Sequence, residues 1–448
     1  MMTANPETPS LWSYHRRHLE RMAAAALRAV DPAVAVRRAL QFQDSCVQIG
    51  ERSYALEDGG RVFIVGAGKA GVAMATAAEA ILGDRIIDGV ISVPDLPDAK
   101  LDHIRFIQGG HPIPTSGSLA AGEAIRDLLL SAKETDLVLA LISGGGSALL
   151  QLPREGLTLD DLQQTNALLL KSGAPIDAFN TVRRHLSKIK GGGLLRLAAP
   201  APVAALILSD VVGDSLESIA SGPTVPATSK PSDALQVLND YDLLDRAPRI
   251  VRRLLEEDDL ESTDAPRAST VEQNLLIGSN RTAAWAAKIE AERMGFHSMV
   301  LTSSLQGEAR EVGRAMAAFT RGLKSGDPAL ELPAALILGG ETTVTVMGDG
   351  IGGRNQELAL SAAIALEGES KIAVMALATD GVDGASPAAG AIVHGGTISK
   401  GRALGLDAEQ ALQDNDSYPY LERVQATIHL GPTGTNVNDL VICLAYEE

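Results

Sequence analysis

Short apolar segments that end in glycine-rich turns recur along the whole chain, and this recurrence limits the folds open to it. Arg61–Val65 runs into the turn Gly66–Gly71, and Asp136–Ile142 runs into Ser143–Ser147. Continuous apolar runs of this length are typical of buried parallel strands. A strand, a turn and a helix in that order form a βα unit. The pattern therefore predicts an α/β fold with mainly parallel sheets and a Rossmann-like N-terminal domain.

The chain is long enough for two such domains. It has 448 residues, and single hydrophobic cores stop growing at roughly 250–300 residues. The interval 258–272 is polar, contains Pro266 and lacks periodicity, which is typical of a linker. We therefore predict two α/β domains, residues 1–260 and residues 261–448, that face each other across an active-site cleft.

Charge and composition limit the kinds of molecule that the protein can bind. The formal net charge of -17 argues against a nucleic-acid surface, which needs clustered Lys and Arg. It also means that a site for a phosphate or carboxylate must be built locally from a few cations and backbone N–H groups. No apolar run reaches the roughly 18 residues that cross a bilayer. The two cysteines, Cys46 and Cys443, lack metal-ligand or redox spacing, so we expect a cytoplasmic protein with no membrane partner.

The first glycine-rich turn carries a lysine. Gly66 to Gly71 matches G-x-G-x-x-G, which is a weak signal alone, and it lacks the Walker A spacing. Lys69 distinguishes it from a dinucleotide turn, because a cation inside the turn suits a concentrated phosphate charge. The alternative is a solvated lysine at a helix start, where a cation is mildly unfavourable. We predict that Gly66, Gly68 and Lys69 contact a phosphate.

A second anion-binding turn and a cationic helix follow. The turn is Ser-Gly-Gly-Gly-Ser before a helix; no G-x-S-x-G elbow surrounds either serine, so a nucleophile is disfavoured. The helix from Asn180 to Lys190 gathers Arg183, Arg184 and Lys188, which form either an anion-binding face or a solvated one. The residues of the turn are Ser143, Gly144, Gly145, Gly146 and Ser147.

Carboxylates follow two buried strands. Asp210 comes just after Val203–Leu208, and Asp380 and Asp383 follow Ile372–Ala378. α/β enzymes keep metal ligands and general bases at such strand ends. We therefore count all three carboxylates as candidates for the site.

The stretch that ends in Arg354 predicts a third ligand loop. Ala335–Leu338 reads as a buried strand that stops at Gly339, and Glu341–Met347 alternates like a second strand. Four glycines then let the backbone approach an anion, and Arg354 stands where a helix should begin. A plain turn is the alternative. The glycines are Gly348, Gly350, Gly352 and Gly353.

Together these stretches resemble the glycerate 2-kinases of the two-domain class, whose C-terminal part is called the MOFRL domain. The motifs VGAGKAG, GGHPIP, SGGGSALL, NTVRRHLSKIKGG, SDVVGD, GGETTV, GGRNQELAL, TDGVDG, NDSYP and GPTGTNVNDL occur in order. The resemblance implies ATP-dependent phosphorylation of D-glycerate at its 2-hydroxyl, with Mg²⁺, in a cleft between two α/β domains. It also implies that Lys69 and Arg354 are the main catalytic cations.

The resemblance further implies that Asp210, Glu341, Asn355, Asp380 and Asp383 lie near the cleft. Our hypothesis for the mechanism is that Asp210 accepts the proton of the glycerate hydroxyl and that Asp380 with Asp383 holds Mg²⁺ directly or through water. The remaining candidates would hold nucleotide or substrate, and the sequence leaves open which of them binds the triphosphate and which the carboxylate. They are Gly66, Gly68, Ser143, Gly144, Gly145, Gly146, Ser147, Asn180, Arg183, Lys188, Gly339, Glu341 and Asn355. The chain departs from the family pattern at Ala227, Thr228, Pro387 and His394.

Two other functions stay open at this point. An NAD(P)H-dependent hydroxypyruvate reductase would use GAGKAG as a dinucleotide turn, but no ribose-binding acid and no His–acid pair is placed for it. A regulatory module would sense sugar acids without turnover. For the kinase, the expected partners are D-glycerate and ATP, and the sequence leaves a homodimer open.

Overall fold

The computed structural model describes residues 11–56, 59–98, 100–257, 271–325 and 330–447. They form two compact units. Pro32–Ile277 is one, called here the N-unit, and Gly278–Glu448 joins Met1–Asp31 in the other, the C-unit. This division differs from the predicted boundary at 260/261, because helix α1 (Leu11–Ala29) packs on α11 (Asn280–Arg293) of the C-unit. Residues 258–270 of the predicted linker lie outside the described residues.

The N-unit is built on a six-stranded sheet with the order β6-β5-β4-β7-β8-β9. The strands from β4 to β8 pair in parallel, and every residue of β4, β7 and β8 is buried. Counted from β4, the order is 3-2-1-4-5-6, that of doubly wound dinucleotide-binding sheets. This agrees with the predicted Rossmann-like arrangement. The strands are β4 (Val62–Ala67), β5 (Ile86–Val93), β6 (Ile104–Gln108), β7 (Leu137–Ile142), β8 (Val203–Leu208) and β9 (Val271–Gly278).

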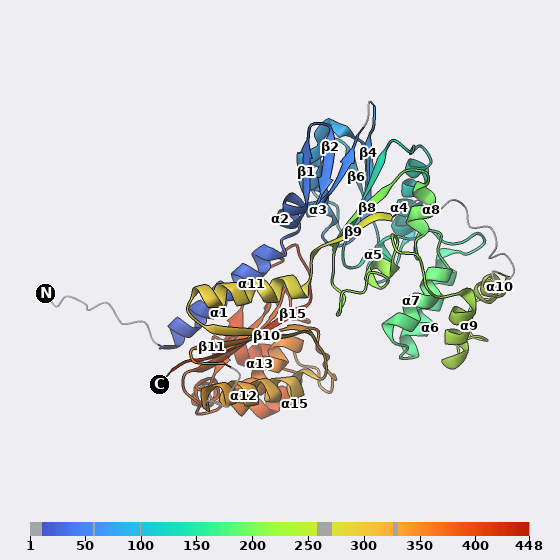
Figure 1. Ribbon diagram of the computed structural model, residues 1–448. Coiled ribbons are helices and arrows are strands. Elements are labelled where there is room, and N and C mark those ends of the chain that lie inside the picture. The colour runs from blue at the N-terminus through green and yellow to red at the C-terminus, as the bar shows by residue number, and fades with distance from the viewer. Residues whose placement is uncertain (1–10, 57–58, 99, 258–270, 326–329, 448) are drawn as a thin grey trace. The chain divides into compact units, whose positions relative to one another are not determined.

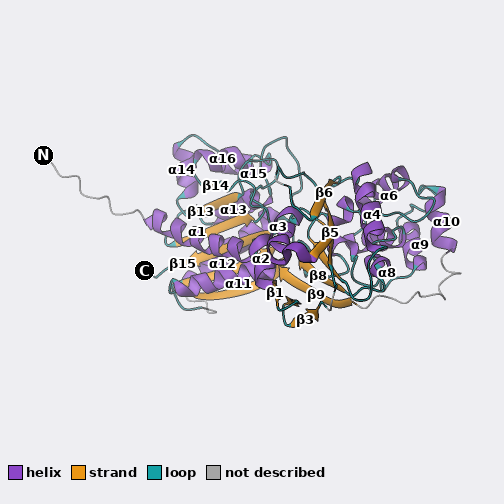
Figure 2. Ribbon diagram, turned by 90° about the horizontal axis from the view of Figure 1, so that it is seen from above, coloured by secondary structure: helices purple, strands orange, loops and turns teal. Residues whose placement is uncertain are grey.

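Helices cover both faces of this sheet (Figures 1 and 2). Helix α3, with α2 against it, packs on one face, whereas α4, α5 and α8 share a core with the strands on the other. Helices α6, α7, α9 and α10 enclose a separate core. The bounds are α2 (Pro32–Ala39), α3 (Gly71–Leu82), α4 (Ser116–Leu129), α5 (Gly146–Leu149), α6 (Leu159–Lys171), α7 (Ile176–His185), α8 (Gly193–Ala198), α9 (Pro231–Asp240) and α10 (Arg249–Glu257).

Three short strands and two single-turn helices complete the N-unit. Strands β1 (Leu40–Gln43), β2 (Cys46–Ile49) and β3 (Arg52–Ala55) form a small antiparallel sheet. The single-turn helices η1 (Gly83–Arg85) and η2 (Ile219–Ser221) precede β5 and follow β8. Helix η2 matters for the site, because it brings Ser221 against the turn after β7.

The C-unit sheet has the order β10-β11-β15-β12-β13-β14. In it β10 and β11 pair in parallel, whereas β15 lies antiparallel between β11 and β12, and β13 and β14 continue antiparallel. Mainly parallel strands were predicted for both sheets. The N-unit sheet has this arrangement, whereas the C-unit sheet is mixed. The reason is that β15 enters the sheet from a loop without a crossover helix. The strands are β10 (His297–Leu305), β11 (Ala334–Gly340), β12 (Ile372–Ala378), β13 (Gly390–His394), β14 (Thr427–Ile428) and β15 (Asp439–Ala445).

Helices also cover both faces of the C-unit sheet (Figure 1). Helices α1 and α11 pack on one face, and α12 and α13 share a core with the strands on the other. Within the described residues, no helix combines the length and apolar character that crossing a membrane requires. The remaining bounds are α12 (Ala309–Ser325), α13 (Arg354–Ala365), α14 (Thr397–Ala403), α15 (Ala408–Gln413) and α16 (Ser417–Arg423).

One predicted strand does not form. Glu341–Met347 alternates in sequence, but these residues lie in a loop with a single bridge from Thr343 to Glu308. Backbone N–H groups that strand pairing would use donate to side chains instead. The N–H of Thr345 donates to Glu308, and the N–H of Met347 donates to Asn415. The prediction of a strand here is wrong because side-chain hydrogen bonds replaced strand pairing.

Candidate active site

Two of the predicted anion-binding turns lie side by side in the N-unit. One follows β4 and the other follows β7, its parallel neighbour, where the strand order reverses. The backbone N–H of Lys69 donates to the carbonyl of Gly144 (2.9 Å), and the N–H of Ser143 donates to the carbonyl of Ala67 (3.0 Å). Ligands of doubly wound sheets bind at this switch point. Two turns predicted separately therefore form one candidate site.

Gly66 and Gly68 allow the two turns to approach. A Cβ on Gly66 would lie 1.9 Å from the carbonyl oxygen of Leu141, and one on Gly68 would lie 2.0 Å from Oγ of Ser143. Ser143 is buried, and its Oγ accepts from the N–H of Ala70 at the start of α3 (3.1 Å). These three residues therefore hold the turns together, a role that the predicted phosphate contacts did not include.

The side chains of Asp210, His111 and Lys69 gather around Gly144 and Gly145. A Cβ on Gly144 would lie 2.1 Å from Oδ2 of Asp210. One on Gly145 would lie 3.0 Å from Cδ2 of His111 and 3.5 Å from Cγ of Lys69. Lys69 is exposed, and burial together with its charge lowers the pKa of His111. His111, which belongs to the GGHPIP motif, thus stands as a neutral imidazole beside the predicted catalytic lysine.

A chain of hydroxyl groups fixes the turn after β7 from its other end. Oγ of Ser221 donates to Oδ1 of Asn180 (3.0 Å) and lies 2.9 Å from Oγ of Ser147. Because the single hydroxyl proton of Ser221 goes to Asn180, Ser147 is the donor to Ser221. Asn180 is almost fully buried. Ser221 was not predicted as a site residue. The signal that could have found it is the turn Ser-Gly-Pro-Thr after β8, which begins with this serine.

Arg183, three residues after Asn180 on α7, is a partly buried cation. Its guanidinium carbon lies 3.9 Å from the ring centroid of Phe179, and its Nε donates to Oδ1 of Asn166 (3.0 Å). Burial lowers the pKa of Arg183 to about 10, and no carboxylate of the described residues offsets that effect. A desolvated cation without a counter-charge is costly, and an anionic ligand would supply the missing charge.

Lys188 does not share this environment. Its ammonium pairs with the exposed carboxylate of Glu155 (2.7 Å) and borders a cavity of about 500 Å³ with Arg154 and Arg196. Arg183 lines a different, much smaller cavity. The single cationic face predicted for Arg183 and Lys188 is not formed, because α7 ends at His185.

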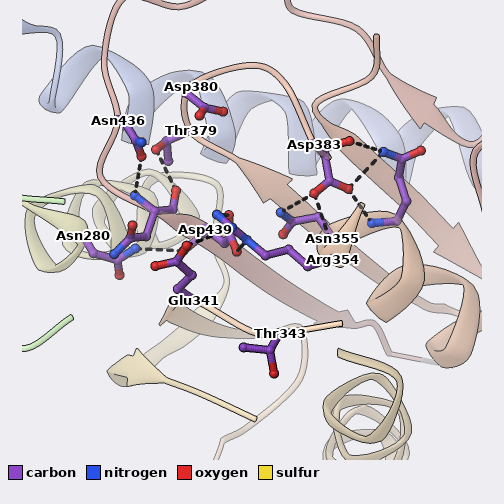
Figure 3. Close-up of polar contacts among 12 residues, drawn as sticks. Asn280, Glu341, Thr343, Arg354, Asn355, Thr379, Asp380, Asp383, Asn436 and Asp439 are labelled. Carbon is purple, nitrogen blue, oxygen red and sulfur yellow. Dashed lines mark hydrogen bonds and ion pairs between the residues drawn. The ribbon is translucent and has the colours of Figure 1, made fainter. Parts of the chain in front are cut away.

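The C-unit places Arg354 between two carboxylates (Figure 3). Arg354 is the first residue of α13. Its Nε and Nη2 donate to the two oxygens of Asp439 (2.5 and 3.0 Å), and its Nη1 pairs with Glu341 (2.8 Å). Asp439 is 4% exposed, whereas the side chain of Glu341 is 43% exposed. Sequence reasoning did not assign Asp439, whose only signal was an acid at the start of an apolar strand.

Both partners of this buried pair have raised pKa values. Burial alone would lower the pKa of Arg354, but the hydrogen bond and charge of Asp439 raise it. Burial raises the pKa of Asp439 to about 6, against the effect of Arg354. Since arginine stays protonated in proteins, Asp439 is the partner whose ionisation can change.

Asp383 and Asn355 form the N-terminal cap of α13 (Figure 3). Oδ1 of Asp383 accepts from the backbone N–H and Nδ2 of Asn355 (both 3.2 Å), and Oδ2 accepts from the N–H and Nε2 of Gln356 (both 2.9 Å). Asp383 is 2% exposed, and burial raises its pKa. Its oxygens are therefore committed to the helix that carries Arg354.

Asp380 is separate from Asp383. Figure 3 shows its carboxylate on the side of Thr379 and Asn436, away from Asp383. Its Oδ1 accepts from the N–H of Val382 (3.2 Å), and the residue is only half-buried. Among the described residues, no three His, Cys, Asp or Glu side chains gather as metal ligands. The predicted Asp380–Asp383 pair is thus not brought together.

Gly339 makes room for Asn280, a residue that sequence reasoning missed. A Cβ on Gly339 would lie 1.6 Å from Oδ1 of Asn280. Nδ2 of Asn280 donates to the carbonyl groups of Val437 and Asp439 (both 2.8 Å). Gly339 therefore packs against the side chain that holds the backbone of Asp439, in addition to its predicted place among the ligand-binding residues.

Comparison with known proteins extends these observations. A domain family described as "Domain of unknown function (DUF4147)" matches residues 18–256, and the MOFRL family matches residues 334–439. The glycerate 2-kinase of Pyrococcus horikoshii is 40% identical over 95% of this chain and 96% of its own. The D-glycerate 2-kinase of Thermotoga maritima is 44% identical, over 86% of this chain and 90% of its own. A protein of Agrobacterium vitis named putative hydroxypyruvate reductase is 38% identical over 95% and 93%.

A solved structure supports the same family assignment. The crystal structure of the glycerate kinase of Thermotoga maritima has a TM-score of 0.87 and 40% identity, and the match covers 96% of this chain and 99% of that one. Fold and site thus define a two-unit α/β protein with a glycine-rich ligand turn at a switch point. The chain belongs to the glycerate 2-kinase family that carries the DUF4147 and MOFRL domains, which confirms the resemblance seen in its motifs.

Proposed function

We propose that this protein transfers the γ-phosphoryl group of ATP to the 2-hydroxyl of D-glycerate. The observation that carries the proposal is the convergence of Lys69 and Asp210 on Gly144 and Gly145, at the switch point of a doubly wound sheet. A cation and a carboxylate at one nucleotide-type turn suit transfer of a charged group between oxygens. The names of the relatives from Pyrococcus and Thermotoga support the same reaction.

This reaction requires positioned substrates and positively charged side chains, and it does not require a nucleophile on the protein. In phosphoryl transfer the negative charge is spread over the equatorial oxygens, and fixed cations stabilise it. Lys69 and Arg354 would supply those cations. Asp210 would accept the proton of the substrate hydroxyl as the oxygen attacks phosphorus. His111, neutral beside Lys69, would donate or accept a hydrogen bond without adding charge.

Arg183 would bind an anionic group of substrate or nucleotide. Its guanidinium is desolvated and stacked on Phe179, with no carboxylate of the described residues offsetting its charge. A planar guanidinium can pair with a carboxylate or phosphate through two parallel N–H groups. Lys188 is the weaker candidate, because Glu155 already neutralises it.

Mg²⁺ would reach the site with the nucleotide. Mg²⁺ is usually held by one or two carboxylates together with substrate phosphates rather than by a protein cage. Asp383 does not fit as a ligand, because four donors already occupy its oxygens. Asp380 and Glu341 fit better, since both carboxylates are partly exposed. The ion would offset phosphate charge there.

The rival activity, reduction of hydroxypyruvate by NAD(P)H, has weaker support. A dinucleotide turn of this type is followed by an acid at the end of the second strand, which binds the ribose. Here β5 ends in Ser92 and Val93. Lys69 inside the turn also has no task in hydride transfer.

The deciding experiment compares three readouts on one preparation. ADP release with D-glycerate and ATP tests the kinase, and phosphorus NMR fixes the position of the new phosphate. Loss of nicotinamide absorbance with hydroxypyruvate tests the reductase. Thermal stabilisation by D-glycerate without either product would indicate a sensor. ADP formation that depends on D-glycerate and yields 2-phosphoglycerate is the expected result, and its absence refutes the proposal.

A homodimer in the cytoplasm completes the proposal. Strand β10 is an edge of the C-unit sheet, and its Leu301 is 47% exposed. Such an edge can pair with a second copy. Cys46 and Cys443 are both free thiols, as is usual in a reducing compartment. Light scattering would give the mass, and a monomer at all concentrations would remove the dimer from the proposal.

A further inference from the structure

We propose that Asp439 is a positioning residue for Arg354, which holds the guanidinium in the orientation that phosphoryl transfer needs. The inference rests on the proposed function, since it assigns a task to Arg354. Asp439 lies within the motif GPTGTNVNDL, and the inference gives it a task that the sequence did not assign.

The first support is the geometry of the pair. Two N–H groups on one edge of the guanidinium, on Nε and Nη2, meet the two oxygens of a single carboxylate. Such bidentate contact fixes the plane of the group as well as its place, which a single ion pair does not do. The contact between Nη1 and Oε1 of Glu341 is an ion pair of 2.8 Å.

The second support is that the contact leaves donors for a ligand. An arginine has five N–H groups. Asp439 takes one on Nε and one on Nη2, whereas Glu341 meets Nη1 as an ion pair. Each terminal nitrogen therefore keeps at least one N–H that the hydrogen bonds to Asp439 do not use. Arg354 can therefore stay bound to Asp439 while it donates to two phosphoryl oxygens.

The third support is that Asp439 is itself rigidly held. It is the first residue of β15, which has hydrogen-bonded neighbours on both sides, Gly340 of β11 and Ala378 of β12. Nδ2 of Asn280 donates to its backbone carbonyl. A free arginine side chain would lose rotamer entropy on being ordered by the substrate. Asp439 orders it before the substrate arrives.

Exposure separates the tasks of the two carboxylates. Asp439 is 4% exposed, whereas the Glu341 side chain is 43% exposed and meets Arg354 at one nitrogen. An incoming anion can replace an exposed single contact far more easily than a buried double one. Asp439, rather than Glu341, is therefore the partner that keeps its hold on Arg354 during turnover.

Chemical rescue with guanidinium tests the proposal on the full-length protein. Arg354→Ala should lower kcat by about 10³-fold and leave a gap beside Asp439. Millimolar guanidinium should then restore kcat by at least about tenfold, because Asp439 binds the free ion as it binds the side chain. In Arg354→Ala/Asp439→Asn, guanidinium should restore nothing, and kcat should be no lower than in Arg354→Ala alone.

The single variant Asp439→Asn adds a second measurement. Its kcat should fall by about tenfold or more, while the KM values for D-glycerate and ATP stay within about threefold, as expected for an interaction made in the transition state. A matched control is Asp136→Asn, which removes another buried carboxylate bound to an arginine, Arg61, through two nitrogens. It should lower the melting temperature but leave kcat unchanged.

One arm of the experiment needs no variant of Asp439. In Arg354→Ala, guanidinium should rescue far better than ammonium at equal concentration, since only the planar ion matches a carboxylate at two points. Equal rescue by ammonium, rescue that survives Asp439→Asn, or a kcat of Asp439→Asn equal to wild type would each overturn the inference. A wild-type protein that forms no ADP with D-glycerate would instead refute the proposed function, and this inference with it.

Discussion

Lys69 and Gly144 are joined through their backbones: the N–H of Lys69 donates to the carbonyl oxygen of Gly144 over 2.9 Å. The bond ties the turn after β4 to the turn after β7, so that the two present one surface. The side chain of Lys69 stays exposed above it, and Asp210 lies against Gly144. A cation that is placed by backbone contacts can be removed without disturbing the fold.

Lys69→Met should therefore separate activity from stability. We expect kcat to fall by about 10²–10³-fold, the usual effect of losing one charge-stabilising group. The free energy of unfolding should change by less than about 0.5 kcal/mol, because the side chain is exposed. Steady-state kinetics and thermal unfolding measure the two effects. Lys171→Met, at an exposed lysine of α6 in the same unit, is the control and should change neither; a Lys69 variant with wild-type kcat would exclude this lysine from the mechanism.

Asp383→Ala should act on stability, not on the metal. The change leaves the N–H groups of Asn355 and Gln356 without their buried acceptor, which should cost about 2–4 kcal/mol. Urea unfolding measures that loss. Among the molecules that stay folded, the Mg²⁺ concentration for half-maximal activity should be unchanged.

An exposed cap provides the comparison for Asp383. Asp407 accepts from the N–H groups of Glu409 and Gln410 at the start of α15. Since Asp407 is exposed, Asp407→Ala should cost only about 1 kcal/mol. A rise in the Mg²⁺ requirement of Asp383→Ala, with stability like that of Asp407→Ala, would return Asp383 to the metal site.

The parts of the site that the sequence predicted are local in the chain. Lys69 stands out because an apolar strand, glycines and a helix follow one another within a few residues, and Arg354 stands out for the same reason. Such patterns reflect backbone geometry, which neighbouring residues set. The parallel pairing of strands in the N-unit also follows from local βα units, because each crossover returns the chain in the same direction.

The parts that the sequence did not predict depend on residues far apart. Asp439 meets Arg354 across 85 positions of the chain, and Asp383 caps a helix that starts 29 positions before it. No local pattern distinguishes a carboxylate that caps a helix from one that binds a metal. Helix α1 is a further example, because its sequence does not indicate that it packs against α11, far along the chain.

Arg183→Met should raise a Michaelis constant and thereby show which ligand Arg183 holds. Loss of a guanidinium that pairs with an anion should raise that ligand's KM by about 10–100-fold, while kcat changes little if the contact is equal in ground and transition states. A rise for D-glycerate alone assigns Arg183 to the substrate carboxylate, and a rise for ATP alone assigns it to the triphosphate. Arg126→Met, at an exposed ion pair of α4, should change neither constant. If both constants also stay at wild-type values in Arg183→Met, the residue binds no ligand.

The C-unit should lose stability in mild acid through histidines buried near α1. His15 is 3% exposed and stacks on Tyr446 (4.0 Å between ring centroids), and burial, followed by the charge of His394, lowers its pKa to about 4. The pKa values of His18 and His394 are also lowered by burial. Nδ1 of His394 accepts from the N–H of Gly396 (3.2 Å), a bond that only the neutral ring can make.

The sign of the effect follows from these directions. A histidine whose pKa is lower in the folded state takes up its proton more readily when unfolded, so stability is complete above pH 6.5 and falls as the pH drops toward 4. For His15 alone the loss should reach about 2 kcal/mol at pH 5. Melting temperatures measured between pH 7.5 and pH 5 (about the window of that titration) would show it. His15→Phe keeps the stacking on Tyr446 but cannot be protonated, so its melting temperature should fall less over the same interval; an equal fall would mean that His15 does not drive the loss.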